Sequence, residues 1–128
     1  MANNGHLHPV TVKEIVNEEH FSLTFTEKIL QQLRKANLVE SHQGHGGGYV
    51  LAKEPSKITL KEIVDCLEGQ TFEVFCMPKT REEIICNHFS LCGLSPVWVT
   101  TKKILDDYYE SVTLEMLVNG TVNKGVEV

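Results

Sequence analysis

Residues 21–53 constrain the fold of this chain more than any other stretch, because the apolar pattern of an amphipathic helix is followed there by a glycine-rich turn. Apolar side chains recur at three- and four-residue intervals in its first half: Phe25, Ile29, Leu33 and Ala36. This spacing predicts a helix with these side chains on one buried face. Four glycines among residues 44–48 predict a sharp turn between strands at residues 39–43 and 49–52. A helix followed by such a hairpin is typical of the winged helix-turn-helix.

The opposite face of this predicted helix is polar and basic, although the whole chain has a formal net charge of −5. It carries Thr24, Lys28, Gln31 and Lys35. If the helix enters a major groove, these side chains can form hydrogen bonds with bases and phosphates. The turn that follows, with His45 and Gly46 at its tip, can then approach the neighbouring backbone or minor groove. The same pattern also fits a surface helix of any small α+β domain.

Capping signals predict where the helices of this region begin. Thr11 and Glu14 form a capping box that opens a short helix, and Thr24 and Glu27 repeat the pattern at the start of the longer one. The longer helix is expected to end near Asn37, a residue that tolerates the left-handed backbone conformation of many helix ends. Two helices separated by a short turn are the signature of a helix-turn-helix.

The C-terminal half contains signals for further helices. Thr59 and Glu62 form a third capping box, and the Ser95–Pro96 pair opens a longer helix. An apolar stripe follows that pair: Val97, Thr101, Ile104, Leu105, Tyr108 and Val112. We interpret this stripe as a homodimerisation surface, because dimeric helix-turn-helix proteins need an element that spaces their two reading heads. The alternative is a stripe packed only on its own core.

The predicted fold is therefore α+β and mostly helical, with a winged helix-turn-helix domain followed by a long C-terminal dimerisation helix. The chain divides into a disordered lead-in (1–9), a winged helix-turn-helix DNA-binding region (10–69), a cysteine-bearing sensor loop (70–95), the dimerisation helix with a closing helix (96–118), and a polar tail (119–128). Acidic residues outnumber Lys and Arg only after residue 53, by twelve to seven. An acidic chain can bind DNA only through a local basic surface.

Composition argues against other classes of protein. A hydrophobic fraction of 41% and a charged fraction of 23% are ordinary for a soluble domain. The sequence has no apolar signal segment at its start and no apolar run approaching the roughly 18 residues of a membrane span. We therefore expect a cytoplasmic protein without a membrane partner. An enzyme is not expected, because no nucleophile–base pair, phosphate loop or metal-hydrolase motif is present.

Cys76, Cys86 and Cys92 lie just before the long helix and are the candidate metal ligands. Without an export signal, cysteines favour metal or thiol chemistry over a disulfide framework. Three widely spaced thiols favour an iron–sulfur cluster, of 2Fe–2S or 4Fe–4S type, over zinc in a Cys₃His site. Free or redox-active thiols are a third interpretation. Candidates for a further ligand are His88, Ser95, Glu82 and Glu83, and the remaining cysteine, Cys66, has no assigned chemistry.

Together these segments resemble the iron–sulfur winged-helix transcription regulators of the IscR, NsrR and RirA group. The resemblance covers roughly residues 9–118 and rests on PVTVKEI, LRKANLVES, GHGGGYVLAK, ITLKEIVDCLEG, the three-cysteine loop and TLEMLV. It implies a homodimeric bacterial regulator of a double-stranded DNA operator, expected to be a repressor. Its DNA affinity would depend on a cluster that senses redox, nitric oxide or iron status.

By position, the resemblance places Thr24, Glu27 and Lys28 at the family's base and phosphate contacts, and the three cysteines at its cluster ligands. Gln43 stands at a wing position that often holds arginine, which removes a charge suited to a narrow minor groove. Ser95 stands where some members have a histidine ligand. The family also usually begins with a helix of two turns or more, and this chain starts where that helix should be finished.

Two other functions are compatible with the sequence. The first is a cluster-free regulator of the same fold that uses its cysteines as thiol switches. The second is a winged-helix module that binds proteins and no DNA, which the acidic charge balance and Gln43 both allow.

Overall fold

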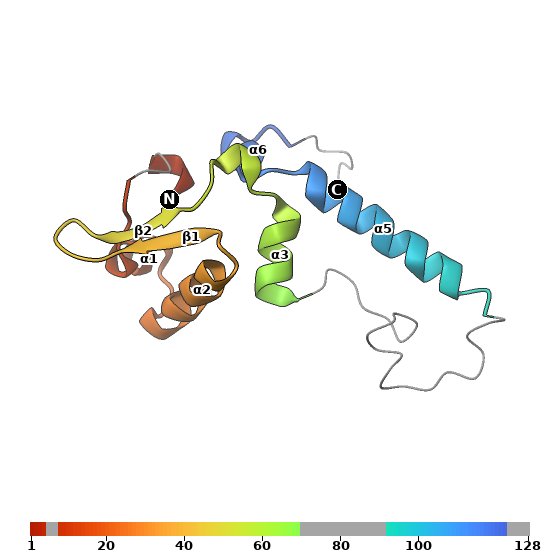
Figure 1. Cartoon of the computed structure of the whole chain (residues 1–128), viewed down its shortest axis with the longest axis horizontal. Helices are drawn as coiled ribbons and strands as arrows, with labels where there is room; N and C mark the ends of the chain where they lie inside the picture. Colours follow the sequence, from red (N-terminus) through yellow and green to blue (C-terminus); the bar gives the residue numbers. More distant parts are fainter. Residues whose placement is uncertain (5–7, 70–91, 123–128) are drawn as a thin grey trace.

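The computed structural model describes residues 1–4, 8–69 and 92–122, which form a winged helix-turn-helix with a long helix extending from it (Figure 1). The elements are η1 (Ala2–Asn4), α1 (Val12–Glu19), α2 (Leu23–Lys35), β1 (Val39–His42), β2 (Gly48–Leu51), η2 (Pro55–Lys57), α3 (Leu60–Glu68), α5 (Ser95–Ser111) and α6 (Leu114–Asn119). The predicted mixed, mostly helical fold is confirmed. Several candidate ligands lie outside the described residues: Cys76, Glu82, Glu83, Cys86 and His88.

Helix α1 begins at the predicted capping box. The Thr11 hydroxyl accepts a hydrogen bond from the Glu14 N–H (3.3 Å), and the Glu14 carboxylate accepts one from the Thr11 N–H (2.7 Å). These hydrogen bonds satisfy N–H groups that have no partner within the helix. The one that the Glu14 carboxylate accepts from the Thr11 N–H lowers the pKa of Glu14. The helix ends at Glu19, and the left-handed backbone of the following His20 (φ 58°) turns the chain toward α2.

Helix α2 starts two residues earlier than predicted. Its N-cap is Ser22, whose hydroxyl accepts a hydrogen bond from the Phe25 N–H (3.2 Å), so the predicted Thr24–Glu27 cap is wrong. Serine is on average a better N-cap than threonine, and Ser22 stands where the preceding turn ends. The helix ends at Lys35, and Asn37 has the expected left-handed conformation (φ 57°).

The buried face of α2 is also rotated from the predicted one. Thr26 and Leu30 are buried, whereas Phe25 is 50% exposed. Burial of a threonine is tolerated because its hydroxyl donates a hydrogen bond to the Ser22 carbonyl (3.0 Å). The periodic pattern locates the apolar stripe, but the arrangement of neighbouring elements decides which edge of that stripe is covered.

Strands β1 and β2 form the wing, an antiparallel hairpin in which His42 pairs with Gly48. Residues 43–47 therefore form the turn, so the first strand ends one residue earlier and the second begins one residue earlier than predicted. Gly44 and Gly46 have φ of 103° and 79°, conformations that glycine adopts without steric cost. Val10 extends the hairpin on its other side through two backbone hydrogen bonds with Tyr49 (2.9 and 2.8 Å).

The junction between the domain and the long helix is a backbone bridge. Leu60 N–H donates to the Val112 carbonyl and Leu114 N–H donates to the Ile58 carbonyl, both at 2.8 Å. Ile58 and Val112 are 1% and 3% exposed. Val112 was expected on the long helix, but it lies just after it in extended conformation, where the bridge buries it.

The start of the chain contributes to the same region. Ala2–Asn4 form a turn of 3₁₀ helix that contacts α6, so the prediction of a disordered lead-in is wrong for these residues. None of the described helices is long and apolar enough to cross a membrane.

Candidate nucleic-acid interface

Helix α2 presents all its predicted DNA-contacting side chains at the surface. The exposed residues are Thr24, Glu27, Lys28, Gln31 and Lys35. Within the described part of the chain, neither Lys28 nor Lys35 forms an ion pair with a carboxylate. Their ammonium groups can therefore pair with phosphates without first breaking an internal interaction. The helix is held from behind by the buried residues Thr26 and Leu30.

Arg34 joins α2 to the wing, and the sequence reasoning missed it. Its guanidinium donates a hydrogen bond to the Ser41 hydroxyl on β1 (3.3 Å), with both residues exposed. This contact links the helix to the hairpin and places a positive charge between them. The available signal was the pair of basic residues in the last turn, which the helix dipole favours. Its partner on the strand depends on how the strand packs beside the helix.

The wing tip is open to an incoming surface. Gln43, His45 and Gly46 are all exposed. A side chain added at Gly44 or Gly46 would meet no atom within 4 Å, so the backbone here has free space around it. A phosphate backbone can approach such a tip closely. Helix α2 and the wing are consecutive along the chain and adjacent in space, as Figure 1 shows.

Helix α3 is braced to α5 by an ionic cluster of four residues. Lys61 contacts Asp65 (2.5 Å) and Asp106 (3.5 Å), and Lys102 contacts Asp106 from the other side (2.9 Å). The side chains of Lys61, Lys102 and Asp106 are only 20–24% exposed. The hydrogen bond to Asp65 raises the pKa of Lys61, and Asp106 adds to this effect while burial opposes it. This ionic brace and the backbone bridge hold α3 and α5 at a defined angle.

Cys92 is the one predicted cluster ligand among the described residues. It is half-buried and precedes α5, where its carbonyl accepts a hydrogen bond from the Ser95 N–H (3.4 Å). Cys66 is half-buried on α3, and this burial raises the pKa of its thiol, which favours an unreactive neutral form. The described residues contain no group of three His, Cys, Asp or Glu side chains placed to hold a metal ion.

Comparison with known protein families agrees with this geometry. Residues 1–120 match the family model Rrf2, described as an iron-dependent transcriptional regulator. The chain belongs to the Rrf2 family. A Neisseria meningitidis protein whose name places it among HTH-type transcriptional regulators is 31% identical over 118 residues, covering 92% of this chain and 77% of that protein. The HTH-type transcriptional regulator IscR of Klebsiella pneumoniae is 29% identical over 119 residues. The match covers 93% of this chain and 71% of that protein.

Solved structures of Rrf2-type regulators have the same fold. CymR of B. subtilis, the global cysteine regulator, superposes with a TM-score of 0.69 at 28% identity and covers 93% of this chain and 84% of that one. IscR of T. potens superposes with a TM-score of 0.65 at 28% identity. The superposition covers 99% of this chain and 81% of the T. potens chain. The expected resemblance to IscR-type winged-helix regulators is therefore confirmed, and the chain is a transcription regulator of this family.

Proposed function

We propose that this protein regulates transcription by placing α2 in a DNA major groove and its wing against the adjacent backbone. One observation carries this proposal: a single exposed helix face combines Thr24, Lys28 and Gln31, and Arg34 ties that helix to the wing. The three polar side chains can contact bases and phosphates, whereas the wing has open space at its tip. An acidic chain needs such a locally basic surface.

We propose that the regulator is a homodimer formed through α5. Val97, Ile104 and Tyr108 are 51%, 62% and 51% exposed, although all three are apolar or aromatic. The opposite side of the helix is occupied by the ionic brace to α3. A second copy packed on the exposed side would bury these residues and would present two α2 helices to successive turns of DNA.

We propose that Cys76, Cys86 and Cys92 hold an iron–sulfur cluster. Thiolates are the usual ligands of iron–sulfur clusters, and the family description and the IscR relatives both point to iron. Cys92 fits this role because it precedes the N-terminus of α5, where the helix dipole favours negative charge. When bound, the cluster would supply a centre that reacts with oxidants or nitric oxide.

The chain itself offers a route from Cys92 to the DNA-contacting surface. Cys92 adjoins one end of α5, and the other end is joined to α3 by the backbone bridge. Helix α3 packs on α2. A displacement of α5 at Cys92 would therefore tilt α3 and reposition α2 relative to its copy in the dimer.

A test combines cluster assay and DNA binding. Protein purified without oxygen should be coloured and contain iron and sulfide, whereas Cys92→Ala should lose both and respond differently to the operator. DNA binding should also fall steeply with the logarithm of salt concentration. Cys92→Ala protein with unchanged iron content and unchanged DNA affinity would contradict the cluster proposal, and binding independent of salt would contradict DNA contact.

A thiol switch is the second candidate, favoured by the likeness to CymR. One matching CymR structure, from Staphylococcus aureus, is described as the oxidized form. If the cysteines act this way, anaerobically purified protein would be colourless, and a thiol oxidant would change DNA affinity reversibly. If neither preparation binds DNA, the proposal that α2 and the wing contact DNA would be contradicted.

A further inference from the structure

The wing contains no lysine or arginine, although it is the part of the domain proposed to lie against a DNA backbone. Within residues 39–51 the acidic residue is Glu40. The other groups there that can change charge near neutral pH are the imidazoles of His42 and His45. The hairpin therefore has a net charge of −1 when both imidazoles are neutral and of +1 when both are protonated.

The turn at the wing tip holds His45 in a defined place. The Gly47 N–H donates a hydrogen bond to the Gly44 carbonyl (3.0 Å), so His45 and Gly46 are the two central residues of a β-turn. A side chain at Gly47 would collide with the His42 carbonyl oxygen, because the backbone of the turn packs closely on itself. His45 is exposed at this corner, and the glycines on either side of it have open space around them. A phosphate can therefore approach its imidazole.

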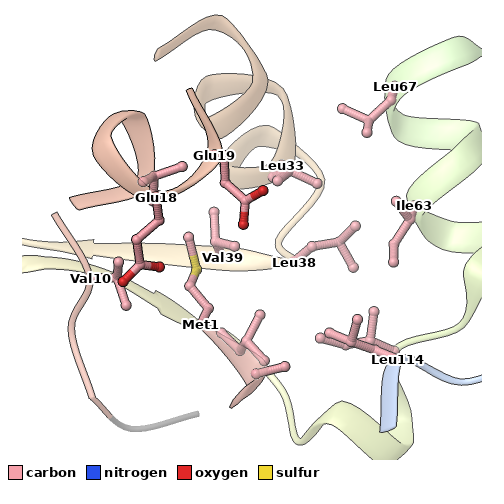
Figure 2. A pocket seen from close by; sticks show the side chains of 14 residues that line it. Met1, Val10, Glu18, Glu19, Leu33, Leu38, Val39, Ile63, Leu67 and Leu114 are labelled. Carbon is pink, nitrogen blue, oxygen red and sulfur yellow. The ribbon is translucent and has the colours of Figure 1, made fainter. Parts of the chain in front are cut away.

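His42 lies on the outer face of the same hairpin. Val39, three residues earlier on β1, lines the apolar interior of the domain together with Leu33 (Figure 2). Because successive side chains of a strand lie on opposite faces, Glu40 and His42 share the outer face, where both are exposed. The Glu40 carboxylate repels phosphates from this face, and a proton on His42 would offset that charge.

The other charges beside the wing come from lysine, arginine and carboxylate side chains. Near the outer face, Lys53 pairs with Glu62 (2.6 Å). Lys57 pairs with Glu54 in the same region (3.0 Å). On the side of α2, Arg34 donates its hydrogen bond to β1. Groups of these three kinds keep their charge near neutral pH, so a change in the potential of the wing over this range comes from histidine.

We propose that protonation of His42 and His45 controls the contact between the wing and DNA, so that the protein binds DNA more tightly as the pH falls from about 8 to about 6. Each protonated imidazole gains a positive charge and a second N–H donor. Both changes favour contact with a phosphate or with the negative potential of a narrow minor groove. The histidines would thus supply, at lower pH only, the charge that Gln43 does not provide. This response rests on the proposed placement of the wing against DNA and adds a signal to it.

The test measures, by fluorescence anisotropy, binding of the full chain to a fluorescein-labelled mixed-sequence duplex of roughly 30 base pairs. Wild type should bind about tenfold more tightly at a pH of about 6 than at about 8. The slope of the logarithm of affinity against the logarithm of salt concentration should be steeper at the lower pH by about two for each bound wing. H42Q/H45Q should match wild type at the higher pH and lose most of the gain at the lower one. H42K/H45K carries permanent charges and should bind tightly at both.

The matched control, H8Q/H20N, removes two exposed histidines outside the wing. His8 lies two residues before Val10, which pairs with β2, and asparagine suits the left-handed backbone of His20. This variant should keep most of the pH response. Equal pH responses of wild type and H42Q/H45Q, or an equal loss of response in H8Q/H20N, would overturn the proposal and leave DNA binding intact. Absence of DNA binding by every variant at both pH values would contradict the placement of α2 and the wing on DNA, and this response with it.

Discussion

Lys28 lies in the middle of the exposed face of α2 and has no ion-pair partner among the described residues. We expect Lys28→Ala to weaken DNA binding by roughly five- to tenfold at all DNA sequences, because one phosphate contact is lost. The slope of log K against log[salt] should become shallower by about one for the same reason. Gln32→Ala is the control, since Gln32 is half-buried on the neighbouring side and should act mainly on stability. Fluorescence anisotropy at several salt concentrations, with folding checked by circular dichroism, measures both. Equal losses of DNA affinity in the two variants would contradict the proposed orientation of α2.

Glu62 couples the start of α3 to the segment that follows β2. Its carboxylate accepts hydrogen bonds from Lys53 Nζ (2.6 Å) and from the Thr59 N–H (3.0 Å), and these interactions lower its pKa below 4.5. In the window below that value the unfolded chain binds more protons than the folded one. The stabilisation by Glu62 is therefore complete above about pH 4.5 and is lost as the pH falls through the lower, folded-state pKa.

Replacing this carboxylate should flatten the acid limb of the stability curve. We expect Glu62→Gln to lower the free energy of unfolding at pH 7 by less than about 1 kcal/mol, because the pair is 38% exposed on both sides. The difference from wild type should shrink as the pH falls below 4.5. Urea unfolding between pH 7 and 3 measures it, with Glu110→Gln at an exposed site as control. If the free energy of unfolding of wild type and Glu62→Gln depends on pH in parallel, the stabilising role given to the Glu62 carboxylate would be contradicted.

At the scale of elements, the brace between α3 and α5 is the most specific contact that joins the domain to the long helix. In a double-mutant cycle, Lys61→Ala and Asp106→Ala should show a coupling free energy of about 0.5–1 kcal/mol, because both side chains are largely shielded from solvent. The control is Lys103 with Asp107, an ion pair within α5 whose side chains are 71% and 59% exposed. Its coupling should be smaller than about 0.5 kcal/mol. If the coupling free energy of Lys61 with Asp106 is no larger than that of Lys103 with Asp107, the brace adds no stabilisation beyond that of an exposed ion pair.

Among the elements themselves, the short-range features were predictable and their packing was not. Two of the three predicted capping boxes form, at Thr11 and at Thr59, because a cap depends on residues within one turn. The third failed because Ser22 ends the preceding turn and serine is the stronger N-cap. The contact between Arg34 and Ser41 joins residues seven positions apart on different elements, and no local sequence pattern predicts such a contact.

At the scale of the whole molecule, α5 has one side covered by α3 and another exposed. We expect Ile104→Glu to convert the proposed dimer to a monomer, because it would place a charge in an apolar interface. Val99→Glu introduces the same change at a residue that is also exposed but lies roughly 140° around the helix, at 3.6 residues per turn. Sedimentation velocity should therefore show a monomer for Ile104→Glu and a dimer for Val99→Glu. A dimer in both variants would place the interface elsewhere.

The sequence alone determined the main helices and both strands, and that they compose a winged helix-turn-helix followed by a long helix. Periodicity, capping residues and glycines act over a few neighbouring positions, so they can be read along the chain. Only the tertiary structure decided that Thr26 and Leu30 are the buried side of α2 and that Val112 closes the junction with α3. Burial is decided by which distant elements pack on a helix, and that packing is set by contacts between residues far apart in the chain.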